Sequence, residues 1–170
     1  LAVVKKAFSS LLLTVLVGGC AGYQLGPATP AHLRNIKTIA VPTFANTTLT
    51  PRIEVLITST IIKQFQQDGT FRIASEDQAD AILKGEIVAV GRSPARSLRG
   101  NVLSTTEFNL NVSVRYTLIT RDGRVLHPGS AGGSTSFFVG TDVSTDERQA
   151  LPLAAEELAK HLVSQLSEGW

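Results

Sequence analysis

The chain has 170 residues, of which 43% are hydrophobic and 18% charged, and its formal net charge is +2. This length and hydrophobic content favour one compact domain over two. A charge so close to neutral, without a basic helix, gives no support for a nucleic-acid partner. The single cysteine excludes an internal disulfide and directs attention to its place in the chain.

The first 19 residues have the layout of an export signal. Two lysines precede eleven uncharged, mostly apolar residues (7–17), and two glycines then lead to Cys20. Eleven helical residues span about 16 Å, roughly half of the hydrocarbon layer, so a permanent transmembrane helix is not expected. We therefore predict that residues 1–19 are a signal peptide that is removed.

The residues before Cys20 resemble the lipobox of bacterial lipoproteins, in which small residues precede a cysteine that becomes lipid-modified. Val17 departs from that pattern, because leucine is commonest there. Acyl chains on Cys20 would anchor the protein stably, since each buried CH₂ contributes about 0.8 kcal/mol. Ala21 stands where aspartate is the usual inner-membrane retention signal, so the outer membrane, on its periplasmic side, is predicted. A signal cut elsewhere would leave an ordinary cysteine.

Charge in the mature chain is balanced but uneven. Without residues 1–19, 14 basic and 14 acidic side chains remain. The segment from Arg92 to His127 contains six arginines and two acids, whereas the segment from Thr141 to Trp170 contains six acids and two bases. The chain therefore has a basic middle and an acidic tail.

Residues 20–35 are predicted to form the lipidated cysteine and a flexible tether, because proline and small residues dominate from position 26. A single domain is expected over residues 36–170. Its first strand is predicted at 36–44 from the β-branched residues there, and Pro42 indicates an edge position or a strand end.

A first amphipathic helix is predicted to follow. Thr50 and Pro51 look like an N-cap and a first-turn proline, and Gly69 ends the pattern. Apolar residues recur at intervals of three and four, at Ile53, Leu56, Ile57, Ile61 and Phe65. One stripe of this helix is expected to pack on a sheet.

Three strands are predicted in the middle of the chain. A short strand at 70–74 leads to one at 81–90, where apolar residues on both faces indicate a central position. Residues 92–100 are predicted to be a loop. The clearest strand is 107–118, whose buried face is predicted to hold Phe108, Leu110, Val112, Val114, Tyr116 and Leu118.

An antiparallel hairpin and a second helix complete the predicted domain. Asp122 and Gly123 suit a tight turn, and a partner strand is expected from Val125, with a glycine-rich interruption before residues 134–139. Ser144 and Glu147 resemble a capping box. A second apolar stripe then runs to the terminus through Leu151, Ala155, Leu158, Leu162 and Leu166.

Pro152 complicates the start of this second helix, because an internal proline costs a hydrogen bond, so the regular part is expected from Leu151. The predicted fold class is α+β. It is a two-layer sandwich with two helices on one face of a mainly antiparallel, four-stranded sheet.

No enzymatic motif is present in this pattern. His32, His127 and His161 fall in a tether, a hairpin and a charged helix face, and their spacing does not suit a metal. An acylated cysteine cannot act as a nucleophile. Glu156 and Glu157 are adjacent helix positions that point in different directions. We therefore predict a binding protein without catalytic residues, cofactor or metal.

Arginines are the candidate site residues for an anionic ligand. They are Arg92, Arg96 and Arg99 in the predicted loop, with Arg121 and Arg124 at the hairpin tip. Guanidinium groups bind phosphates bidentately, so an anionic glycolipid or an acidic protein surface would suit them if both loops share one end of the sheet. An ordinary solvated loop is the alternative. The polar face of the 107–118 strand would equally suit the wall of a partner protein.

In order and spacing, several segments resemble the LptE family of lipopolysaccharide-assembly lipoproteins. The matching segments are Cys20 to Leu25, Ile39 to Asn46 with Pro51 and Glu54, Ala79 to Gly85, Val112 to Tyr116, and the leucine-rich tail that ends at Trp170. The resemblance covers almost the whole chain. It departs at Pro152, where members generally continue a helix.

This resemblance implies a two-helix, four-strand sandwich that plugs the outer-membrane barrel LptD and helps it assemble. It also implies contact with lipopolysaccharide on its way to the cell surface, and no catalytic residues. The first strand is also similar to that of periplasmic lipoproteins that activate a cell-wall synthase or form a secretion assembly. That is the alternative function.

Overall fold

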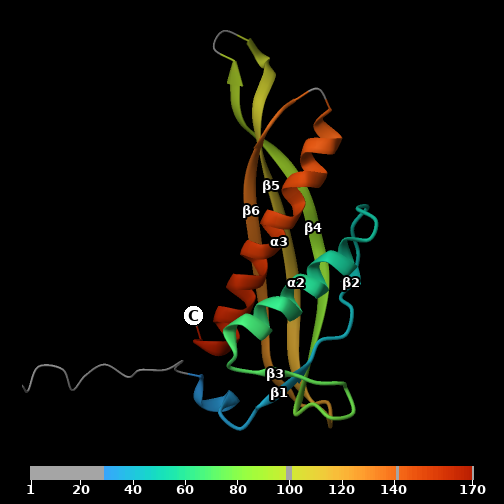
Figure 1. The fold of residues 1–170 in the computed structure, drawn as a ribbon, viewed down its shortest axis with the longest axis vertical. Coiled ribbons are helices and arrows are strands. Elements are labelled where there is room, and N and C mark those ends of the chain that lie inside the picture. The colour runs from blue at the N-terminus through green and yellow to red at the C-terminus, as the bar shows by residue number, and fades with distance from the viewer. Residues whose placement is uncertain (1–28, 99–100, 141, 170) are drawn as a thin grey trace, which may run out of the picture.

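The computed structural model describes residues 29–98, 101–140 and 142–169 (Figure 1). Its elements are the 3-10 helix η2 (Ala31–Leu33), β1 (Thr38–Ala40), β2 (Ala45–Asn46), α2 (Ile53–Asp68), β3 (Arg72–Ile73), β4 (Ala81–Leu98), β5 (Asn101–Thr120), β6 (Val125–Phe138) and α3 (Val143–Ser167). Leu33 is fully buried, so the last residues of the predicted tether belong to the domain.

Within this described part, the sheet has six strands, and the prediction of four mainly antiparallel strands was wrong in both respects. The order is β3-β1-β4-β5-β6, with β2 also on β4. β1 runs parallel to β3 and β4, and β2 runs parallel to β4, whereas β4, β5 and β6 are antiparallel. The helix between β1 and β3 is the crossover that parallel pairing needs.

Pro42 explains why β1 is much shorter than the strand predicted at 36–44, and why β2 begins only beyond that range. β1 ends at Ala40, and pairing with β4 resumes only at Ala45, because a proline has no N–H to donate. β4 is central, as its apolar residues predicted.

Both helices cover one face of the sheet, as predicted (Figure 1). α2 buries Ile53, Ile57, Thr58, Ile61 and Phe65. α3 buries a longer stripe: Ala150, Ala154, Ala155, Leu158, Ala159, Leu162, Val163, Leu166 and Ser167. On the sheet, the predicted alternation of buried and exposed residues along β5 is confirmed. Five of its six predicted apolar residues are buried, and Phe108 is half-buried.

The predicted helix starts were wrong. α2 begins at Ile53 after Arg52 in the left-handed region (φ 62°), so Thr50 is not its N-cap, whereas Gly69 (φ 77°) ends the helix as predicted. α3 begins at Val143 with Asp142 as its N-cap, rather than with a capping box at Ser144. Pro152 lies inside α3 on its exposed side, and the buried residues around it keep the helix continuous.

Strands β4 and β6 are longer than predicted. β4 continues to Leu98, because β5 pairs with the segment that was predicted to be a loop, although bulges follow Pro94. β6 shows no interruption at its glycines. A Cβ at Gly133 would lie 2.0 Å from the carbonyl oxygen of Ala154, so this glycine allows α3 to approach the strand. The turn between β5 and β6 has Gly123 at φ 86°, in agreement with the predicted hairpin.

The segment from Ala79 to Gly85 joins the two halves of the sheet. One carboxylate oxygen of Asp80 accepts the N–H groups of Lys37 and Thr38, each at 2.9 Å. Gly85 leaves room for the ring of Phe44, since a Cβ there would lie 2.1 Å from a ring carbon. These contacts give the segment a structural role.

Candidate functional site

The β4–β5 hairpin is the most prominent projection of the molecule. Its strands have 18 and 20 residues, and their far ends extend beyond both helices (Figure 1). Two of the predicted arginines, Arg92 and Arg96, belong to this end of the hairpin. The structure shows how both are held, whereas the third predicted arginine of this group, Arg99, lies outside the described residues.

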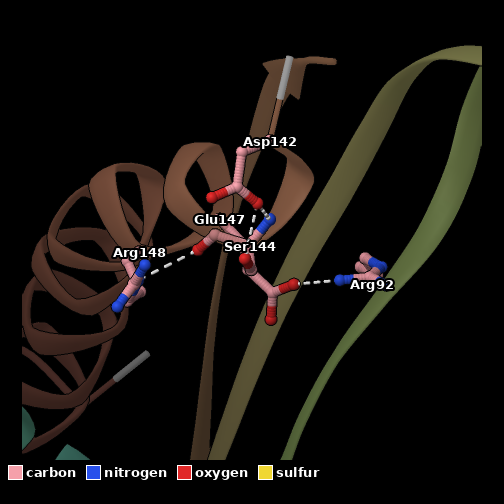
Figure 2. Close-up of polar contacts among 5 residues, drawn as sticks. All are labelled: Arg92, Asp142, Ser144, Glu147 and Arg148. Atoms are coloured by element: carbon pink, nitrogen blue, oxygen red, sulfur yellow. Dashed lines mark hydrogen bonds and ion pairs between the residues drawn. The ribbon is translucent and has the colours of Figure 1, made fainter. Parts of the chain in front are cut away.

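Arg92 lies on the helix-covered face of the hairpin. It pairs across the strands with buried Leu110, and its guanidinium carbon is 5.5 Å from the centroid of the Phe108 ring. The guanidinium also forms an ion pair with Glu147 of α3 (Figure 2). Its side chain remains 44% exposed. Arg92 therefore connects the hairpin to α3, and only part of its surface is open to a ligand.

Arg96 lies on the opposite face of the same hairpin. It pairs with Glu107, after a bulge between Pro94 and Arg96 that reverses the alternation. Its Nε is 3.6 Å from the Glu107 carboxylate, and its side chain is 71% exposed. A salt bridge this exposed contributes little to stability. Most of the Arg96 side chain thus faces solvent.

Arg121 and Arg124 lie at the other end of the sheet. Antiparallel pairing puts Ala81, at the start of β4, opposite Thr120, at the end of β5. Arg121 donates there to the backbone oxygen of Ala79 at 3.0 Å. The condition that both arginine loops share one end of the sheet is therefore not met. Only the hairpin arginines remain a candidate group.

The start of α3 is fixed by a compact hydrogen-bond network (Figure 2). Asp142 accepts the backbone N–H of Ser144 at 3.0 Å and the hydroxyls of Ser144 and Thr145, each at 2.6 Å. These bonds stabilise the carboxylate and lower the pKa of Asp142 to about 2. Arg148 Nε donates to the carbonyl of Ser144 at 3.1 Å. The cap orients the first turns of α3 so that Glu147 reaches Arg92.

Sequence reasoning missed Glu147 as a residue of the candidate site. Its sequence context indicated a capping box, but its partner is Arg92, 55 positions away. Only the tertiary packing of α3 beside the hairpin brings the two together. Phe138, at the end of β6, is also 68% exposed near this end of the sheet, and no periodic pattern had singled it out.

The open face of the sheet is polar. Along β5 it carries Asn109, Asn111, Ser113, Arg115 and Thr117. Arg115 lies 3.7 Å from Glu86 of β4, and both side chains are partly exposed. Neither α2 nor α3 lies against this face, so it can contact a partner through hydrogen bonds rather than through apolar burial.

The histidines have structural neighbours. His32 and His127 stack with centroids 5.7 Å apart, and the Nδ1 of His161 is 2.7 Å from the oxygen of Gly132 on the edge strand β6. In the described ranges no three His, Cys, Asp or Glu residues are grouped closely enough to hold a metal ion. No helix in those ranges is long and apolar enough to cross a membrane. Cys20 lies outside them.

A comparison with protein families decides the affiliation of the chain. The family model for LptE, described as lipopolysaccharide-assembly, matches residues 36–166. The chain belongs to the LptE family. No curated protein matches it.

Solved structures share the fold of this LptE-family chain at low identity. A PelC dodecamer from Paraburkholderia phytofirmans is 21% identical with a TM-score of 0.51, over 82% of this chain and 94% of that one. A minor lipoprotein from Acinetobacter baumannii is 15% identical with a TM-score of 0.52, over 78% and 93%. A hypothetical protein from Chlamydia trachomatis is 9% identical with a TM-score of 0.55, over 76% and 95%. These likenesses show the fold alone.

Proposed function

We propose that this protein is an outer-membrane lipoprotein that binds and helps to assemble the barrel LptD and takes part in delivering lipopolysaccharide to the outer leaflet. The family match over residues 36–166 carries this proposal. Acyl chains on Cys20 would hold the protein at the periplasmic side of the membrane. The protein would act by binding, without a catalytic step.

The shape of the domain supports a role inside or against a larger protein. The long hairpin extends the sheet well beyond its two helices (Figure 1). Amides and hydroxyls line the open face of β5, and such groups can pair with the polar lumen of a barrel. A wet, polar contact of this kind is compatible with specific binding.

Depletion of the protein in its own bacterium tests the proposed role. Folded barrel and surface-exposed lipopolysaccharide should both decrease, and wild-type protein supplied from a plasmid should restore both. Normal levels of folded barrel and of surface lipopolysaccharide after depletion would contradict the proposal.

The hairpin arginines are the proposed contact for lipopolysaccharide phosphates. Arg96 is the best placed of those described, because it is largely exposed on the open face, whereas Arg92 is partly engaged by Glu147. Replacing Arg92, Arg96 and Arg99 with serine is expected to weaken lipopolysaccharide binding at low salt.

The control for that variant is the double replacement of Arg121 and Arg124 with serine, which removes two charges where the hairpin variant removes three. These two charges lie at the opposite end of the sheet. We expect it to change binding little. Equal binding by wild type and the hairpin variant, or equal losses in both variants, would exclude the hairpin as the phosphate contact.

A lipoprotein that forms a secretion assembly or activates a cell-wall synthase is the second candidate. The fold shared with a protein that forms a PelC dodecamer favours it. Light scattering of the lipoprotein, purified in mild detergent together with whatever partner it retains, separates the candidates. A large closed oligomer of this chain alone would favour an assembly, whereas a single copy bound to one barrel would favour the first proposal.

A further inference from the structure

The loop between β2 and α2 (residues 47–52) projects from the side of the molecule (Figure 1). Leu49 is fully exposed there, and Val55, just inside α2, is 61% exposed. A single exposed apolar side chain is common on protein surfaces. The loop that carries Leu49 is, in addition, held by side-chain hydrogen bonds within itself, to β4 and to α2.

The side chain of Asn46 organises the loop from inside. Its Nδ2 donates to the carbonyl of Thr50 at 2.9 Å and to the carboxylate of Glu54 at 3.0 Å. Its Oδ1 accepts the backbone N–H of Thr48 at 2.9 Å and the hydroxyl of Thr48 at 2.8 Å. Four hydrogen bonds from one half-buried amide fix the path of the backbone on both sides of Leu49.

The base of the loop is attached to the sheet and to α2. The N–H and the hydroxyl of Thr47 both donate to the carbonyl of Ile87 on β4, at 3.2 and 2.7 Å. Phe44, which is buried, donates its N–H to the hydroxyl of Thr58 on α2 at 3.0 Å. The loop therefore cannot fold back to cover Leu49 without breaking contacts with two elements.

Arg52 adds local strain. With φ 62°, it is the one non-glycine residue of the described chain in the left-handed region, which disfavours side chains with a Cβ. Glycine would adopt this conformation more easily. The arginine is exposed and forms no ion pair within the described ranges. Strain of this kind is typical of positions retained for a contact.

We propose that the β2–α2 loop is a preorganised protein-binding knob. It would insert Leu49 into an apolar pocket of a partner protein whose rim carries a carboxylate for Arg52. A rigid loop lowers the entropic cost of binding a pocket of defined shape, whereas insertion into fluid lipid requires no fixed shape. An unpaired guanidinium selects a carboxylate rim, because that pair is charge-assisted and bidentate. The inference goes beyond the proposed function, since it does not depend on which protein is the partner.

Site-specific photo-crosslinking in intact envelopes tests this inference. p-Benzoylphenylalanine replaces Leu49 in the full-length chain, where its full exposure makes the replacement harmless to folding. The control places the same probe at Val125, which is 58% exposed beside the β5–β6 turn. Arg52→Gly is then combined with the probe at position 49.

Arg52→Gly separates an effect on binding from an effect on stability. It removes backbone strain, so the melting temperature of the protein should rise, and it also removes the ionic contact with the partner. We expect one discrete protein adduct from position 49, absent from position 125 and reduced several-fold by Arg52→Gly. Adducts to lipid alone, a diffuse set of proteins, no adduct, or an adduct unchanged by Arg52→Gly would overturn the proposal.

Discussion

Substitution of Gly133 by alanine tests how closely α3 packs on β6. A Cβ at this position would lie 2.0 Å from the Ala154 carbonyl oxygen and 2.4 Å from the Leu158 backbone nitrogen. Both obstacles are backbone atoms, so no rotation of a side chain can relieve the clash. The central part of α3 would have to move away from the sheet by more than about 1 Å, which disturbs the longest buried stripe of the core.

The expected cost follows from this displacement. Inserting a methyl group into a packed core costs about 1–3 kcal/mol, and backbone obstacles place Gly133→Ala near the upper limit. For a domain of this size, about 3 kcal/mol lowers the melting temperature by roughly 10 °C. The measurement is thermal and urea unfolding followed by circular dichroism, on protein that also carries Cys20→Ser to avoid detergent.

The adjacent glycine provides the control. The nearest atom to a Cβ at Gly132 is 3.6 Å away, in ordinary van der Waals contact. Gly132→Ala is therefore expected to leave the stability nearly unchanged or to raise it slightly. Equal unfolding free energies for the two alanine variants would refute the close packing of α3 on β6.

Three further predictions concern the anchor, the helix cap and the core. Cys20→Ser should release the protein in soluble form into the periplasm; continued tight sedimentation with membranes would contradict lipid anchoring. Asp142→Ala should destabilise α3 at neutral pH. Because the folded pKa of Asp142, about 2, lies below its ordinary value of 3.8, this contribution is present above pH 3.8 and disappears as the pH falls towards 2. Unfolding curves of wild type and variant should therefore converge in acid, and an equal difference at pH 6 and pH 2 would contradict the cap. Val114→Asp buries an unpaired charge at a position that is 1% exposed, at a cost of several kcal/mol, and should yield no cooperative unfolding transition in circular dichroism; a sharp transition like that of wild type would show that the site is not core.

The parts of the fold that sequence reasoning predicted well have long periodic patterns. β5 alternates over a dozen residues, and both helices carry apolar residues through more than three turns. Gly123 marked the hairpin because its position requires a positive φ. Such signals are local, so one sequence is sufficient to read them.

The parts that were missed depend on distant contacts. β2 has only two residues, too few to show a period of two, and only its pairing with β4 makes it a strand. Gly133 was interpreted as part of an interruption of the strand. The contact that requires a glycine there is with the backbone of α3, which is another element of the fold. Pro94 suggested a loop, yet β5 continues to pair beside it.

The candidate site, like the fold, could be predicted from the sequence only in part. The arginines could be found as a charge cluster in the sequence, but their distribution over two faces and two ends of the sheet could not. A bulge of one residue places Arg92 and Arg96 on opposite faces of the hairpin. The Glu147 partner of Arg92 was likewise invisible, since nothing local connects the two.

A mild-detergent pull-down of the mature lipoprotein from its own envelope, with partners identified by mass, tests the central claim most directly. A tag after the last residue leaves the acyl anchor and the β4–β5 hairpin untouched. We expect recovery of one large outer-membrane barrel together with lipopolysaccharide. Recovery of a cell-wall synthase, or of a closed oligomer of this chain without any barrel, would contradict the proposed role.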